Sequence, residues 1–517
     1  MTEITDSVLI NNLYRILCLR KSRLSEFREI FEEIGILSEV ENGEIRHEQI
    51  RRINEWMERN RGSNNDEIRF IEYLEKFRKL SKSEGNFNEQ LEVTKNIIDY
   101  LLKLLPTPSS QLLLLFVLYM RIMWRVMLSY LPKTQEHALR IAKFRRDNII
   151  HSFRVFLLGC YILYSLYDEK GDYITKCFKE DLKLICECLS DDFKRLIFGT
   201  LYEDEDEIIR ITKYIKRRGR RRKKEDEILW QYIKRVKFRD ILWMWLLSSL
   251  FHDIGKPIED AVKEIKKLIN TYGIKRIDID SLVFSVVKNL KVNGNKVEEF
   301  VKELDEILRD CDNDLCGQIR QFLRNRTGSE KKWDHGILSA MMLYSSFKRL
   351  SERENNRRYL LNYHYTNYYL QLCLLLYLLV AIMLHTKPSK HIFCTSLTQL
   401  LLICDELQEW NRITAIGDRE VMIFPCKSLH LELKDGEMQV FIPYERPIDV
   451  ISQEVFRRFD PKRRWREIAK GNPVCRNNDL LFRKITVHVL LNQTCKICTI
   501  EMHPNGINYS ISHLFLY

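Results

Sequence analysis

The chain has 517 residues, of which 45% are hydrophobic and 30% are charged. This composition excludes general disorder and is sufficient for two or three domains with a sizeable core. The formal net charge is +12, from 84 Lys and Arg against 72 Asp and Glu, and eight of the positive charges lie in the basic run 216–224. Since the excess is partly local, it is weak evidence for nucleic-acid binding, although it would attract a small anionic substrate.

Residues 1–131 have the pattern of an N-terminal helical region without recognisable chemistry. Their apolar residues recur at the helical spacing of three and four, as in Phe27, Ile30, Phe31 and Ile34. The apolar run 112–131 is interrupted by two arginines one turn apart, which favours a packed helix over a membrane span. The run 370–384 is shorter than the ~20 residues that cross a bilayer. We therefore predict no membrane span.

The most informative motif is His252-Asp253, which is followed by Ile254-Gly255-Lys256. It ends an apolar segment, 228–251, that is too rich in Trp and Leu for a surface helix and should be buried. A histidine and a carboxylate at the end of a buried helix need a partner. Candidate partners lie at several other positions along the chain.

Four further candidates lie on or beside strongly apolar helical segments: His151, His335, His385 and Asp405. The order along the chain is therefore His, His-Asp, His, His, Asp. Neutral imidazole and carboxylate groups suit a divalent cation such as Mn, Mg, Fe, Co, Ni or Zn. Without a suitably placed cysteine, a thiolate zinc site is not favoured. These residues predict a centre for one or two divalent ions.

The order of these residues resembles the HD-domain superfamily, helical metal-dependent phosphohydrolases and phosphodiesterases that are named for an adjacent His and Asp. The flanking sequences His-Asp-Ile-Gly-Lys-Pro, Asp-His-Gly and Cys-Asp-Glu-Leu-Gln-Glu-Trp resemble an uncharacterised microbial branch of it. The resemblance covers roughly residues 135–415. It implies a helical HD-type catalytic domain, which we place at 132–415.

The resemblance also implies roles for individual residues. The ligands of a single-metal site would be His151, His252, Asp253 and Asp405. His335 and His385 match the additional histidines of two-metal members. With Asp253 as a bridge, two ions about 4 Å apart would generate a hydroxide nucleophile at neutral pH. Lys256 would stabilise charge on a phosphoryl oxygen, so Asp253 and Lys256 are the predicted catalytic residues.

Each of these residues has a plainer interpretation. A lone histidine on an apolar helix is more often a satisfied core residue than a ligand. Asp334 before His335 is also compatible with the N-terminus of a helix. His391 can take the place of His385, and Lys256 can simply pair with a nearby acid. Beyond Asp405, the charged groups either form a solvated helix face or orient the ligands; they are Glu406, Glu409 and Arg412.

The long spacing between the candidate ligands predicts two inserts in the catalytic domain, near 168–226 and 287–325. The first contains an acidic stretch and then the basic run 216–224. Such a run is usually an exposed loop, and the alternative is a contact with phosphate or nucleic acid. No interleaved aromatic residue supports stacking on bases.

From residue 416 the sequence changes to the alternation of β-strands, with strands expected at 421–425, 429–433, 438–443, 485–491 and 498–502. The predicted fold class is therefore mainly α, with an N-terminal helical region, a helical HD-type domain and a smaller β-rich domain at 416–517. A sheet there can bind a ligand, a partner or a second subunit, so an oligomer is possible.

The leading hypothesis is a metal-dependent phosphohydrolase that hydrolyses a phosphomonoester or phosphodiester, with a nucleotide as the preferred substrate class. One alternative is a di-iron oxygenase of the HD superfamily, and another is a non-catalytic regulatory protein that binds a nucleotide. The chain carries 14 cysteines scattered through apolar segments and no signal-like start. These features favour a reducing compartment, and we expect a cytoplasmic protein.

Overall fold

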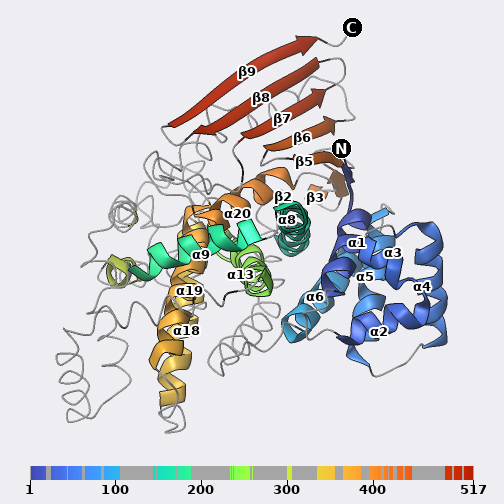
Figure 1. Ribbon diagram of the computed structural model, residues 1–517, viewed down its shortest axis with the longest axis horizontal. Helices are drawn as coiled ribbons and strands as arrows, with labels where there is room; N and C mark the ends of the chain where they lie inside the picture. The colour runs from blue at the N-terminus through green and yellow to red at the C-terminus, as the bar shows by residue number, and fades with distance from the viewer. Residues whose placement is uncertain are drawn as a thin grey trace.

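In the computed structural model, the described residues are those in the following ranges and positions: 2–18, 25–42, 45–60, 65–82, 87–104, 144–146, 148–170, 172–187, 233, 236, 238–256, 259, 300–305, 319, 335–355, 365–385, 395–408, 413–416, 419–422, 428–434, 437–444, 482, 484–491, 494–503 and 506–515. Figure 1 shows the elements they form, with the central helices between a group of N-terminal helices and a sheet of late strands.

The N-terminal region is helical apart from one short strand. Its elements are β1 (Thr2–Ile4), α1 (Asp6–Leu17), α2 (Ser25–Ile34), α3 (Leu37–Asn42), α4 (His47–Arg59), α5 (Asp66–Lys82) and α6 (Phe87–Leu104). The Thr5 hydroxyl caps α1 by accepting a hydrogen bond from the backbone N–H of Val8, at 3.3 Å. Phe27 and Phe31, predicted to face the core from a helix, are buried on α2, which confirms that prediction.

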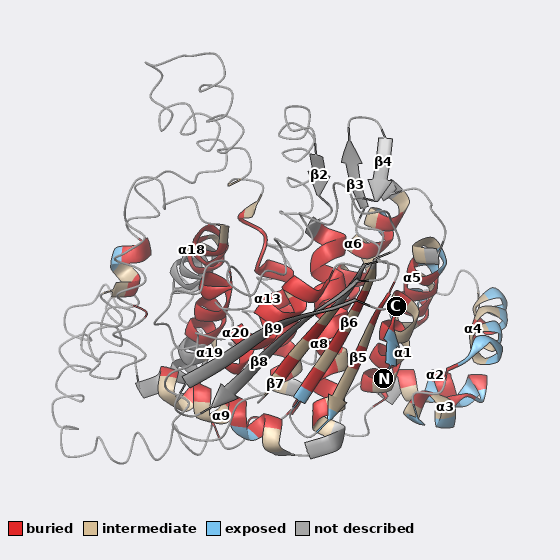
Figure 2. Ribbon diagram, turned by 90° about the horizontal axis from the view of Figure 1, so that it is seen from above, coloured by how far each residue is buried: buried red, intermediate tan, exposed pale blue. Residues whose placement is uncertain are grey.

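The central helices are α8 (Asn148–Lys170), α9 (Asp172–Glu187), α13 (Phe238–Phe251), α18 (His335–Asn355), α19 (Tyr365–Leu384) and α20 (Ser396–Leu407). α8 packs against α1, α6, α13 and α20, and Figure 2 shows that α8 and α13 lie in the buried centre. The Trp245 indole donates a hydrogen bond of 2.9 Å to the Phe156 carbonyl. A Cβ on Gly159 would lie 2.0 Å from that indole, so only glycine permits this close contact of α8 with α13.

The stretch Ile149–Tyr167 of α8 is long and apolar enough to cross a membrane by length and composition. In the structure, 89% of the most apolar 18 residues in this stretch are buried within the protein. A buried core helix has the same length and apolar composition, and α8 is packed among other helices in this way. Of the two runs considered from the sequence, 370–384 lies within α19, and 112–131 lies outside the described residues.

The late strands form a six-stranded sheet of order β1-β5-β6-β7-β8-β9. Its later strands are β5 (Leu429–Lys434), β6 (Glu437–Tyr444), β7 (Lys484–Leu491), β8 (Thr494–His503) and β9 (Gly506–Phe515). β6 and β7 are parallel, and all other neighbours are antiparallel. On β6, Met438, Val440 and Ile442 are buried, as expected for a strand with one face on the core.

A second sheet of three strands joins β2 (Phe144–Arg146), β3 (Ile413–Ile416) and β4 (Arg419–Met422). The predicted fold class, mainly helical with a smaller β-rich part near the C-terminus, is confirmed. The strands β1, β2, β3 and β9 were not predicted. β1 is notable because it brings residues 2–4 to the edge of the sheet beside β5, with Ile4 opposite Leu429.

Part of the predicted first insert packs against the central helices. α9 lies within 168–226, and Asp181 on it accepts hydrogen bonds from the Tyr377 hydroxyl at 2.8 Å and from the backbone N–H of Ser396 at 2.7 Å. Asp181 thereby connects α9 to α19 and to the first residue of α20. The basic run 216–224 lies outside the described residues, so its predicted contacts stay predictions.

Candidate metal centre

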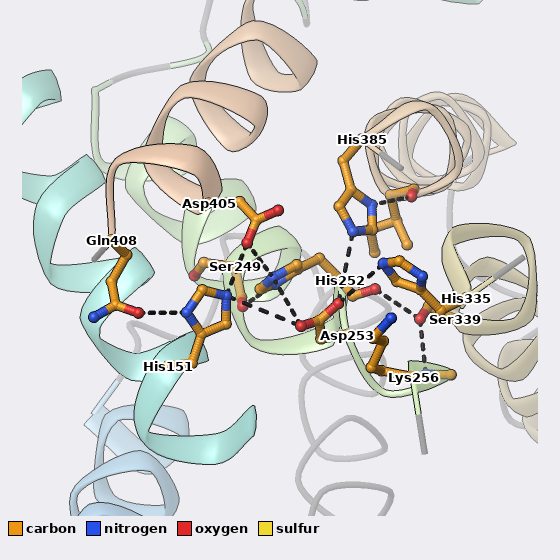
Figure 3. Close-up of polar contacts among 12 residues, drawn as sticks. His151, Ser249, His252, Asp253, Lys256, His335, Ser339, His385, Asp405 and Gln408 are labelled. Atoms are coloured by element: carbon orange, nitrogen blue, oxygen red, sulfur yellow. Dashed lines mark hydrogen bonds and ion pairs between the residues drawn. The ribbon is translucent and has the colours of Figure 1, made fainter. Parts of the chain in front are cut away.

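The six predicted ligands come from five helices and meet at one place in the core (Figure 3). His151 lies in the first turn of α8, His335 begins α18, and Asp405 lies in the last turn of α20. His252-Asp253 directly follow α13, and His385 directly follows α19. Helix ends therefore supply all of these side chains, although up to 254 positions separate them along the chain.

Three side chains gather on one side of Asp253, and we call this group with Asp253 the first half-site. Asp405 Oδ1 lies 2.8 Å from His151 Nε2 and 3.8 Å from His252 Nε2. Asp253 Oδ2 lies 3.9 Å from His151 Nε2 and 3.7 Å from His252 Nε2. Both carboxylates therefore face the same two imidazole nitrogens.

Two histidines gather on the other oxygen of Asp253 and form with it the second half-site. Asp253 Oδ1 lies 3.3 Å from His335 Nε2 and 3.8 Å from His385 Nε2. The two oxygens of one carboxylate thus point to different pairs of histidines. This is the arrangement that a carboxylate bridge between two ions requires.

All four histidines are held through Nδ1. The oxygen partners, in chain order, are Gln408 Oε1 at 2.5 Å from His151, the Ser249 carbonyl at 2.7 Å from His252, Glu259 Oε2 at 2.5 Å from His335 and the Ile382 carbonyl at 2.5 Å from His385. A carbonyl or a carboxylate only accepts, so Nδ1 carries the hydrogen in each neutral ring. Each Nε2 then faces Asp253 or Asp405, where it is placed to bind a cation that lies between the imidazole and the carboxylate.

The donor set fits a divalent cation. Among the described residues, the buried side-chain nitrogens without a hydrogen-bond partner include Nε2 of His252 and of His385. The ligand atoms of His151, His252 and Asp405 lie within 4.8 Å of one another, and so do those of His252, Asp253 and His385. A cation among them would satisfy the orphaned nitrogens and neutralise the two carboxylates. Imidazole and carboxylate donors suit Mn, Fe, Co, Ni or Zn.

The electrostatics of the centre keep its carboxylates ionised. Burial disfavours the charged form of Asp253, but the neighbouring imidazoles outweigh it and hold the pKa well below its usual range. The pKa of Asp405 is likewise well below normal, against the effect of burial, because His151 and His252 stabilise its charge. Burial also opposes protonation of His252, yet Asp253 and Asp405 raise its pKa to about 9.

The turn after α13 directs His252 and Asp253 to the same site. The Ser339 hydroxyl on α18 donates to the His252 carbonyl at 2.7 Å and accepts from the Gly255 N–H at 2.9 Å. A Cβ on Gly255 would lie 2.6 Å from the His335 carbonyl oxygen, so the chain needs glycine at this close approach. Ser339 and Gly255 thus join the His-Asp turn to the helix that carries His335.

Lys256 lies beside the second half-site, where it pairs with an acid. Its Nζ is 3.2 Å from Glu259 Oε2, and each side chain is 12% exposed. This is the plainer of the two interpretations made from the sequence. The catalytic role of Lys256 at a phosphoryl oxygen stays a prediction, as do the metal-binding roles of the six residues.

Sequence reasoning missed the three groups that orient this centre, which are Gln408, Glu259 and Ser339. Gln408 follows Asp405 by three positions, so helical spacing could have suggested it. Glu406, which was considered instead, is buried on α20. The other orienting candidates, Glu409 and Arg412, lie outside the described residues, as does His391.

Comparisons with models of protein families, with curated proteins and with solved structures found no match for this chain. The chain is a mainly helical protein with buried His and Asp clusters that can hold a metal ion.

Proposed function

We propose that the chain is a metal-dependent phosphohydrolase of the HD type, which hydrolyses a phosphomonoester or phosphodiester, with nucleotides as the first substrate class to test. The observation that carries the proposal is the convergence of four Nε2 atoms on two carboxylates, Asp253 and Asp405, while all four Nδ1 atoms accept or donate a hydrogen bond. A core that needed only packing would not require this alignment.

In this proposal the first half-site holds one ion and the second half-site holds another, with Asp253 shared between them. Ions bound there would lower the pKa of water and offset negative charge on a phosphoryl group. The chain itself contributes fixed ligand orientation, because each imidazole is held at Nδ1. It also contributes burial, since His151, His252 and His385 are each less than 5% exposed, and such a site strengthens electrostatic interactions.

The proposal is tested with a pool of linear and cyclic nucleotides in the presence of Mn²⁺, with products identified by mass spectrometry. We expect a product from the wild-type chain and none from Asp253→Ala. Asp240→Ala is the matched control, because Asp240 lies on α13 outside the centre, and it should retain turnover. Circular dichroism checks that the variants fold. Metal-dependent hydrolysis retained in Asp253→Ala would contradict the assignment.

A di-iron oxygenase of the same superfamily is the second candidate. It is favoured by the same histidine-rich set around one shared carboxylate, since imidazole and carboxylate also suit iron. Iron bound after purification from iron-supplemented cells, with oxygen consumption and no phosphate release, would support this candidate. Tight nucleotide binding with neither activity would instead identify a regulatory protein.

A further inference from the structure

We infer that Glu259 holds Lys256 when no anionic ligand is bound and releases it to a phosphoryl group, while it continues to hold His335. The inference rests on the proposed function and adds one residue to it. Glu259 would set the affinity for the anion through Lys256 and the orientation of the His335 ring in the second half-site. Neither the His-Asp motif nor its spacing pointed to Glu259.

The inference starts from one carboxylate oxygen with two donors. Glu259 Oε2 accepts from His335 Nδ1 at 2.5 Å and from Lys256 Nζ at 3.2 Å. Lys256 and Glu259 lie three positions apart where the chain turns helically after Gly255, with the N–H of Glu259 bonded to the Gly255 carbonyl at 3.2 Å. At that spacing their side chains share one face. Glu259 therefore connects His335, a candidate ligand of the second ion, to Lys256.

Loss of the Lys256 contact costs Glu259 little free energy, because a second hydrogen bond remains. When Lys256 moves to a phosphoryl oxygen, Glu259 keeps its shorter hydrogen bond to the imidazole of His335, so its charge is not left unsatisfied. Lys256 exchanges one charge-assisted contact for another. His335 stays in place, because its own partner has not changed. The ion pair is thus the replaceable contact, and the imidazole contact is the permanent one.

Charge makes Glu259 a competitor of the ligand. The ammonium of Lys256 stabilises a phosphoryl anion fully only when it is not neutralised by a carboxylate at 3.2 Å. Both side chains are mostly buried, so solvent screens this pair less than a surface pair. Removing the charge of Glu259 should therefore tighten anion binding.

The test uses Mn²⁺ and inorganic phosphate as probes, measured by isothermal titration calorimetry on the full chain. Glu259→Gln retains an oxygen acceptor for His335 but has no charge for Lys256. We expect it to bind phosphate several-fold more tightly than wild type at saturating Mn²⁺, and to bind the second Mn²⁺ about tenfold more weakly. Glu92→Gln is the matched control, because Glu92 pairs with Lys95 at the same spacing on a distant helix surface.

Lys256→Ala tests the pair from the other side. It should weaken phosphate binding and leave the affinity for the second Mn²⁺ unchanged, since Glu259 still accepts the hydrogen bond from His335. In the double variant the gain from Glu259→Gln should disappear, because the lysine that it releases is absent. If Glu259→Gln does not fold, as judged by circular dichroism, the two Lys256→Ala measurements decide the matter.

Two results would overturn the inference: phosphate binding by Glu259→Gln that is no tighter than wild type, or phosphate binding by Lys256→Ala that is not weakened. Either result can occur while the wild-type chain binds two Mn²⁺ ions and turns over nucleotides. Failure of the wild-type chain to bind Mn²⁺ would instead remove the proposed function itself.

Discussion

Two polar clusters meet α8 one turn apart, at His151 and at Arg154, and they differ in whether every buried polar atom has a hydrogen-bond partner. Arg154 donates from Nε and Nη2 to both carboxylate oxygens of Asp6, at 2.9–3.2 Å, and each residue is at most 2% exposed. At His151, two carboxylates are surrounded by four imidazoles. Among the described residues, the buried side-chain atoms without a hydrogen bond include two of those imidazole nitrogens and no atom of Asp6 or Arg154.

The comparison shows how a structural cluster can be told from a ligand site. The Arg154–Asp6 pair is complete, because one full positive charge meets one full negative charge in a geometry that satisfies both. At the centre around His151, Nε2 of His252 and Nε2 of His385 have no hydrogen-bond partner beside the two carboxylates, and a divalent cation would satisfy them. Both clusters lie mostly inside the protein, so the pairing of their polar atoms separates them more clearly than their position does.

The sharpest test of the incomplete centre is the number of ions that it loses. Asp253 faces both half-sites and Asp405 faces one, so Asp253→Ala should abolish binding of both Mn²⁺ ions and Asp405→Ala of one. Each loss should exceed the 10–100-fold effect, or about 1.4–2.7 kcal/mol, that is typical of residues behind the ligands. Metal analysis after dialysis gives the stoichiometry. Equal losses in the two variants would argue against a shared carboxylate.

The complete cluster should behave in the opposite way. Asp6→Asn leaves Arg154 buried without a counter-charge, which should lower the free energy of unfolding by about 3–5 kcal/mol and leave Mn²⁺ stoichiometry unchanged. Urea unfolding measures the first quantity. Replacing both partners by apolar residues, Asp6→Leu with Arg154→Met, should restore most of the stability. A loss of bound Mn²⁺ without a loss of stability would place the pair in the metal centre.

Asp181 is a further buried carboxylate, and desolvation has the largest effect on its pKa. Burial raises the pKa of Asp181 to about 6, although Ser396 and Tyr377 donate hydrogen bonds to it. The folded state therefore favours the protonated acid. Its contribution to stability should be fully present below pH ~4 and be lost as the pH rises to about 6, by on the order of 3 kcal/mol. Urea unfolding of wild type and Asp181→Asn at several pH values isolates this change, and a difference independent of pH would contradict it.

The smallest expected effect concerns orientation of a ligand. Gln408→Leu removes the acceptor of His151 Nδ1. It should weaken Mn²⁺ binding in the first half-site about 10–100-fold and leave Mn²⁺ binding in the second half-site unaffected. Gln90→Leu is a control, because Gln90 is equally buried on α6. Calorimetric titration distinguishes the two sites. An effect of the same size in Gln90→Leu would mean that general loosening of the core, and not ligand orientation, causes the change.

Much of this centre could be predicted from the sequence because its chemistry is rare in apolar surroundings. His151, His252 and Asp253 are candidates because histidine and aspartate at the ends of apolar helices need a reason to be there. The apolar periodicity of α2 and the strongly apolar composition of the segment that ends in α13 likewise indicated helices, and the alternation on β5 and β6 indicated strands. These patterns involve residues that are close together along the chain, so they can be recognised in a single sequence.

The orienting groups could not be predicted in the same way. Gln408 contacts a histidine 257 positions away, and Ser339 contacts a backbone carbonyl 87 positions away. Glutamine and serine are common residues, and their roles exist only once the helices are packed. β1 has three residues, too few for a pattern, and β9 was missed although Ile507, Tyr509 and Ile511 alternate.

The pairing of β1 with β5 also has a consequence for synthesis of the chain. Ile4 lies opposite Leu429, so residues 2–4 leave the ribosome long before their partner strand exists. At about 5–20 residues per second, this delay is roughly 20–90 s. Arg154 is synthesised much earlier than β5. During the delay, Arg154 can already pair with Asp6 on α1, while β1 has no partner strand. The N-terminal helices and α8 can therefore pack together during translation, and pairing of β1 with β5 is a late folding event of high contact order.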